Sequence, residues 1–192
     1  MEYSLPAELI PAFDAHFEKG HQLLQSVIIL HGASVRKPGF WAKRKGRQAI
    51  TEFQKCLKLV PHHWPTLWLL GKAYQGLGEH STALRCFVQA YDQQPNSADV
   101  VREASIAAMD SGQPVVAAEY SAIALALAPH DAGLLCNHAV NLLVAGKDHA
   151  ALEFIQQAVN LAPEDPINQH AYKLIQEVTS GTSKRPTWQE IN

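Results

Sequence analysis

GKAYQGLGEHSTALRCFVQAYDQQP, residues 71–95, decides the fold of this chain, because its glycine turn, two of its alanines and its final proline recur at one fixed interval. Four series of identical residues each advance in steps of 34: Pro61, Pro95, Pro129 and Pro163; Ala49, Ala83, Ala117 and Ala151; Ala90, Ala124 and Ala158; Gly78, Gly112 and Gly146. A constant period of this length is typical of a repeat protein.

Each period has the pattern of a helical hairpin. Apolar residues three and four apart indicate helices, and a glycine marks the turn between the two. The proline ends the second helix, because it lacks an amide hydrogen and its ring clashes with the preceding turn. Ser97, Asp131 and Asp165 stand two residues after a proline, where a short oxygen-bearing side chain caps the next helix. The alanines allow helix axes to approach to about 8–10 Å. We therefore expect an all-α chain of stacked hairpins.

The unit at 64–97 resembles the tetratricopeptide repeat (TPR) nearly throughout. It carries the family's signature residues at the expected places: Leu67, Leu70, Gly71, Tyr74, Ala83, Phe87, Ala90 and Pro95. The units at 98–131 and 132–165 are similar, with four departures from the signature: Ser105 for glycine, Ser121 and Ile155 for the large aromatic, and His138 for leucine. The resemblance implies a right-handed superhelix, an α-solenoid, whose first helices line a concave groove.

We expect one TPR domain over residues 1–192. The first repeat departs from the pattern, because its first helix would contain Gly32, Pro38 and Gly39, which disfavour a regular helix. We therefore predict an N-terminal helix within 1–31, from about residue 12, then a basic inserted loop over 32–46 and the second helix of a degenerate repeat over 47–63. After the repeats, the remaining sequence predicts a capping helix over 166–179 and an extended tail over 180–192.

The resemblance implies a non-enzymatic protein-interaction module, an adaptor, scaffold or co-chaperone-like protein that binds a peptide or a helix of a protein partner. The family's groove-facing places correspond to Trp68, Lys72, Gln75, Arg102, Ile106, Met109, Asn137, Val140 and Leu143. Trp68 and Arg102 are our first choices as anchors. An equal alternative for Ile106, Val140 and Leu143 is packing against the chain's own N-terminal helix or tail.

One TPR activity is the two-carboxylate clamp for chaperone C-termini, which requires lysine, asparagine and arginine at set places on successive first helices. The corresponding residues here are Trp68, Lys72, Glu103, Gly133 and Asn137. Only Lys72 and Asn137 have suitable chemistry, and Glu103 would repel a carboxylate. We therefore predict no clamp-type binding.

The stretch RKPGFWAKRKGR, residues 36–47, offers an alternative function, the binding of nucleic acid or another polyanion. Its candidate contacts are Arg36, Lys37, Lys43, Arg44, Lys45 and Arg47, which surround Phe40 and Trp41. Basic charge among aromatic rings can hold phosphates and stack bases. A short patch supplies few phosphate contacts, so we favour a solvated insertion, with its two aromatic rings packed against the first helix pair, over nucleic-acid binding. A third hypothesis is self-association, with Trp188 of SKRPTWQEIN entering a neighbouring copy.

Composition excludes several other classes. The formal net charge of −2 over 192 residues gives no global attraction to polyanions. We find no secretory leader, no membrane-spanning run and no paired-cysteine motif, so we expect a cytoplasmic protein without a membrane partner. The ten histidines lack metal-ligand spacing, and no nucleophile–base pair or phosphate loop is recognisable. We expect no metal, no cofactor and no enzymatic activity.

Overall fold

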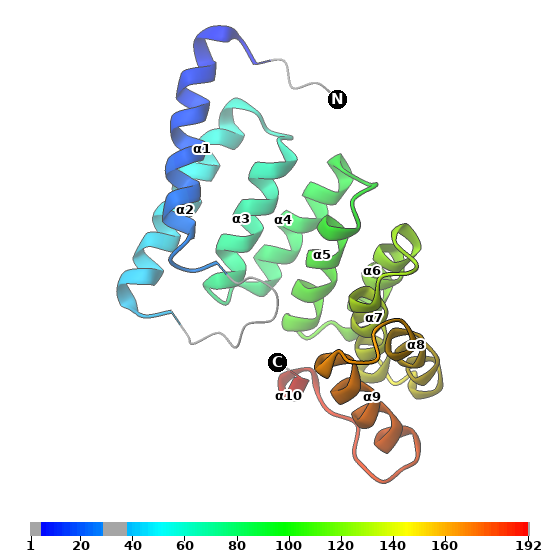
Figure 1. Ribbon diagram of the computed structural model, residues 1–192. Coiled ribbons are helices and arrows are strands. Elements are labelled where there is room, and N and C mark those ends of the chain that lie inside the picture. Colours follow the sequence, from blue (N-terminus) through cyan, green and yellow to red (C-terminus); the bar gives the residue numbers. More distant parts are fainter. Residues whose placement is uncertain (1–4, 29–37, 192) are drawn as a thin grey trace. The chain divides into compact units, whose positions relative to one another are not determined.

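The computed structural model describes residues 5–28 and 38–191 (Figure 1). Every regular element in these two ranges is a helix, which confirms the expected all-α class. The chain divides into two compact units, Met1–Pro95 and Asn96–Asn192, where the repeat pattern predicts one domain. Within the described residues, no helix is long and apolar enough to cross a bilayer.

The first unit contains two helical hairpins. A short 3₁₀ helix, η1 (Ala7–Leu9), leads into α1 (Ile10–Leu24), which packs along α2 (Phe40–Leu59). The second hairpin joins α3 (Trp64–Gly76) to α4 (His80–Gln93), and α2 also packs on α3 (Figure 1). The core of the unit is formed by Leu24, Val27, Ala49, Ile50, Phe53, Leu69, Leu70, Ala73 and Cys86.

Two of the expected boundaries in this unit are wrong. The loop predicted over 32–46 is helical from Phe40 onward, and the helix predicted over 47–63 ends at Leu59. Gly46 does not break α2, and Val27 and Leu77 pack closely against it: a Cβ on Gly46 would lie 3.1 Å from a methyl carbon of each. The N-terminal helix ends at Leu24, short of residue 31, and residues 29–37 lie outside the described residues.

The second unit contains two further hairpins and an added helix. The hairpins pair α5 (Ala98–Asp110) with α6 (Pro114–Leu127), and α7 (Ala132–Val144) with α8 (Asp148–Leu161). Helix α9 (Pro166–Thr179) occupies the range expected for the capping helix and packs on α8 and α7. The side chains of Ser97, Asp131 and Asp165 accept hydrogen bonds from the first free amides of α5, α7 and α9, which confirms the predicted caps.

The turn glycines recur for a conformational reason. Gly78, Gly112 and Gly146 have φ angles of +80°, +77° and +83°, in the left-handed region that other residues rarely adopt. Each glycine stands two residues after the last residue of a first helix, α3, α5 or α7, and so the 34-residue period carries a glycine at these three turns.

The C-terminal tail is not simply extended, since it contains a short helix, α10 (Trp188–Ile191). Arg185 donates through Nε and Nη2 to the two carboxylate oxygens of Asp148, over 3.1 and 2.9 Å. Further along, the indole of Trp188 covers Gly112, where an added Cβ would lie 3.2 Å from the ring. The tail therefore lies on the helix turns of its own unit.

Candidate functional site

In the first unit, the predicted groove residues on α3 are largely withdrawn from solvent. Trp68 is half-buried and packs against the core of the unit. The Lys72 ammonium lies 5.9 Å from the centroid of the Trp68 ring, and the side chains of Lys72 and Gln75 are only 3% and 4% exposed. Trp68 therefore has a structural role in addition to any contact with a ligand.

In the second unit, the predicted groove residues fall into two groups. Met109 and Leu143 are buried. Four remain half-buried, with part of the side chain open to solvent: Arg102, Ile106, Asn137 and Val140. The Arg102 guanidinium forms an ion pair with Asp99 in the first turn of α5, with 3.1 Å between Nη1 and Oδ1. Two of these side chains are apolar, one is a cation and one is an amide, and they lie on the first helices α5 and α7.

A buried polar junction joins the two helices that carry these four residues. Ser105 Oγ donates to the carbonyl of Ala117 over 3.0 Å, and Asn141 Nδ2 donates to Ser105 Oγ over 2.8 Å. The junction joins α5, α6 and α7 directly, and Ile106 and Val140 each adjoin one of its members in sequence. Sequence reasoning recorded Ser105 only as a departure from the family's glycine. A further sign of the junction in the sequence is Asn141, an amide side chain that stands one 34-residue period after Ala107.

A second buried contact joins α6 and α7. Ser121 Oγ donates to the Ala118 carbonyl, over 3.1 Å, and lies 2.8 Å from His138 Nδ1. Because the hydroxyl has a single hydrogen, both bonds form when His138 Nδ1 carries the proton and donates it. The His138 ring also meets Phe154 edge-on, with centroids 4.6 Å apart. Burial lowers the pKa of His138, with a smaller contribution from Lys147. His138 is thus a neutral packing residue.

The polyanion candidates lie on the first turns of α2. Lys43, Arg44 and Lys45 are exposed, whereas Arg47 forms an ion pair with Glu79. Arg36 and Lys37 lie outside the described residues. Phe40 and Trp41 are 73% and 69% exposed, so the expectation that their rings pack against the first helix pair is wrong. Their rings meet edge-to-face with centroids 5.3 Å apart, and the Arg44 guanidinium lies 5.8 Å from the centroid of Trp41. We call Phe40, Trp41, Lys43, Arg44 and Lys45 the aromatic-basic patch.

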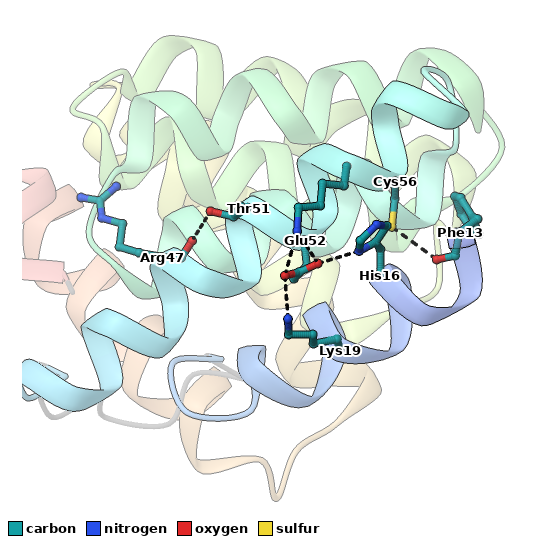
Figure 2. A network of polar contacts seen from close by, with 8 residues as sticks. Phe13, His16, Lys19, Arg47, Thr51, Glu52 and Cys56 are labelled. Carbon is teal, nitrogen blue, oxygen red and sulfur yellow. Dashed lines mark hydrogen bonds and ion pairs between the residues drawn. The ribbon is translucent and has the colours of Figure 1, made fainter. Parts of the chain in front are cut away.

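Glu52 holds α1 against α2 (Figure 2). His16 Nδ1 donates to its carboxylate over 2.7 Å, and Lys19 and Lys55 approach to 3.0 and 3.2 Å. Burial alone would raise the pKa of Glu52, but the bonds from Lys19, His16 and Lys55 outweigh it and lower the pKa to about 2. Beside this network lies a shallow hollow of about 430 Å³, lined by Lys19, Gln22, Leu23, Gln25, Ser26 and Lys45.

The thiols do not form a reactive site. Burial raises the pKa of Cys56, Cys86 and Cys136 to about 11, so the nucleophilic thiolate is scarce at neutral pH. Cys56 Sγ points at the carbonyl of Phe13, 3.7 Å away (Figure 2). Across the described part of the chain, no three His, Cys, Asp or Glu side chains gather closely enough to hold a metal ion.

Comparison with known proteins agrees with the fold. The family model described as tetratricopeptide repeat matches residues 65–97. Among solved structures, the MamA protein is similar with a TM-score of 0.72 and 18% identity, covering 88% of this chain and 82% of MamA. YrrB, described as a TPR protein with an unusual peptide-binding site, has a TM-score of 0.62 and 19% identity over 70% of this chain and 72% of its own.

A third similar structure is the first TPR of Spaghetti (RPAP3) bound to the HSP90 peptide SRMEEVD, with a TM-score of 0.57 and 16% identity over 61% of this chain and 93% of its own. No curated protein matches the sequence significantly. Residues 65–97 therefore match the tetratricopeptide repeat, and the chain as a whole has the helical-hairpin fold of these solved structures.

Proposed function

We propose that this protein is a non-enzymatic interaction module that binds a peptide or helix of a protein partner through the first helices of its repeats. The observation that supports the proposal is that Arg102, Ile106, Asn137 and Val140 on α5 and α7 are half-buried, with part of each side chain open to solvent. We take these four residues together as the binding face. A peptide that buries an apolar side chain against Ile106 and Val140, and presents an acceptor to Arg102, would complement this face. The peptide ligands of YrrB and of the RPAP3 domain support this use of the fold.

The ligand differs in class from the acidic peptide of the RPAP3 domain. A carboxylate clamp needs cations that face the ligand, and here Lys72 is 3% exposed while Glu103 stands at another clamp place. We therefore expect no binding of SRMEEVD in titration calorimetry. Micromolar binding of that peptide would show that the face accepts carboxylates after all.

The proposal is tested by comparing variants in affinity capture from the source cell, followed by calorimetry with the captured partner's binding segment. Arg102→Glu with Val140→Glu should abolish capture while leaving the circular-dichroism melt intact. Val115→Glu is the matched control, because Val115 is 55% exposed on α6, a second helix. Equal capture by the face variant and the control would refute the assignment of this face.

A further inference from the structure

The aromatic-basic patch is unused by the fold and by the proposed peptide site. The buried residues of α2 begin at Gly46 and continue with Ala49, Ile50 and Phe53, which face the core of the first unit. Phe40 and Trp41 precede that stripe and remain mostly exposed. Two large rings kept in water at one helix end mark an interaction surface.

The charge around these rings has one sign. Between Glu18 and Glu52 the sequence has no acidic residue but seven basic ones: Lys19, Arg36, Lys37, Lys43, Arg44, Lys45 and Arg47. In the described structure, Lys43, Arg44 and Lys45 make no ion pair with a carboxylate, whereas Arg47 is neutralised by Glu79. The partner that complements the patch is therefore anionic and has an apolar layer for the rings.

The spacing of rings and cations along the helix narrows the partner further. Arg44 and Lys45 follow Phe40 and Trp41 by four residues, so they lie on the same side of α2, about one turn or 5.4 Å further along. In a bilayer interface, aromatic rings lie at the headgroup level with their apolar part below it, and basic side chains pair with lipid phosphates and carboxylates. We propose that the start of α2 docks on an anionic lipid surface, with Phe40 and Trp41 inserted and Lys43, Arg44 and Lys45 at the headgroups.

Nucleic acid fits the same patch less well. Lys43, Arg44 and Lys45 supply few phosphate contacts. The Phe40 ring and the Arg44 guanidinium already lie against the Trp41 ring, and both would compete with a base for stacking on it. The shallow hollow lined by Lys19 and Lys45 shares Lys45 with the patch and offers room for a headgroup rather than for a strand of nucleotides. We expected no membrane partner because the sequence has no membrane-spanning run and its net charge gives no global attraction to polyanions. Docking of a local basic patch on a surface depends on neither property.

The test is flotation of the purified full chain with vesicles of phosphatidylcholine alone or with about a third phosphatidylserine, near 0.1 M salt. We expect binding only to the anionic vesicles, with a blue shift of tryptophan emission that is reduced in Trp41→Phe. Lys43→Glu with Lys45→Glu, and separately Phe40→Ser with Trp41→Ser, should each weaken binding at least about tenfold.

Matched controls keep the test specific. Lys173→Glu with Lys184→Glu changes two exposed cations elsewhere, and Val115→Ser with Leu161→Ser changes two exposed apolar residues, so both controls should bind like the wild type. Absence of binding to anionic vesicles, equal binding to neutral ones, or equal loss in the controls would overturn the proposal. Tighter binding to a single-stranded oligonucleotide than to anionic vesicles, lost in the Lys43→Glu, Lys45→Glu variant, would assign the patch to nucleic acid instead.

Discussion

Gly20 and Phe53 meet across the first hairpin as Gly71 and Phe87 meet across the second. A Cβ on Gly20 would lie 2.7 Å from Cε1 of Phe53, and a Cβ on Gly71 would lie 2.6 Å from Cε1 of Phe87. Such separations are too short for real atoms, so both glycines are required by the ring that covers them. The α1–α2 pair is therefore built like a tetratricopeptide hairpin, although the connection between its helices is longer.

Substitution at this contact should overpack the hairpin. Gly20→Ala is expected to lower the free energy of unfolding by about 1–3 kcal/mol, because the ring of Phe53 has to leave its place. The cost should shrink in a Phe53→Leu background, where Cε1 and Cζ are gone, and a double-mutant cycle by urea denaturation measures the coupling. An equal loss of stability from Gly20→Ala in the wild-type and Phe53→Leu backgrounds would show that the two residues are not energetically coupled.

The same contact shows what the sequence could predict. Proline, turn glycines and helix caps act within a few residues, so the 34-residue period predicted the hairpins from Trp64 to Leu161 and the helix that follows. The first hairpin was hidden because 33 residues separate Gly20 from Phe53, against 16 between Gly71 and Phe87. The start of α2 was missed because Gly32, Pro38 and Gly39 indicate a loop without showing where it ends, and α2 begins at Phe40, directly after Gly39.

The candidate site was predictable only in part, for a related reason. The family resemblance selected Arg102, Ile106, Asn137 and Val140, which lie half-buried on the first helices α5 and α7, and their contact with a ligand stays a prediction. Whether Lys72 or Leu143 reaches solvent depends on neighbouring helices, and both are buried. The junction of Ser105 and Asn141 joins residues 36 apart, so no local pattern reveals it.

Glu52 should make the first unit sensitive to acid. Its pKa falls from an ordinary 4.5 to about 2 in the folded chain, so it stabilises the fold above pH 4.5 and loses that effect as the pH falls toward 2. Glu52→Gln should cost about 1–3 kcal/mol at pH 7, because its three donors lose a charged acceptor. Urea denaturation at pH 7 and pH 3 measures the cost of Glu52→Gln and its change with pH, and Glu18→Gln, at an exposed position, is the control. An unchanged gap between Glu52→Gln and wild type at the two pH values would contradict this role.

His138 should add a second pH dependence at milder acidity. Burial lowers its pKa from an ordinary 6.5, so the unfolded chain binds the proton more readily, and stability falls as the pH drops below 6.5. The slope from one such site is at most about 1.4 kcal/mol per pH unit. His138→Leu should flatten the dependence between pH 7.5 and 5.5, as measured by denaturation midpoints. His63, whose pKa is also lowered by burial, should keep part of the slope, and a profile identical to wild type would exclude His138.

Trp188 should stabilise the second unit from within the same chain. Its indole covers Gly112, and Arg185 forms an ion pair with Asp148. The tail therefore contacts both the α5–α6 turn and the start of α8. Trp188→Ala should cost about 1–2 kcal/mol, since a half-buried indole is lost. Hydrogen exchange by mass spectrometry should show faster exchange near Gly112 and Gly146. Trp41→Ala is the matched control, because an indole that is 69% exposed contributes little to folding. If truncation after Gly181 instead converts a dimer to a monomer in light scattering, the tail serves a neighbouring copy.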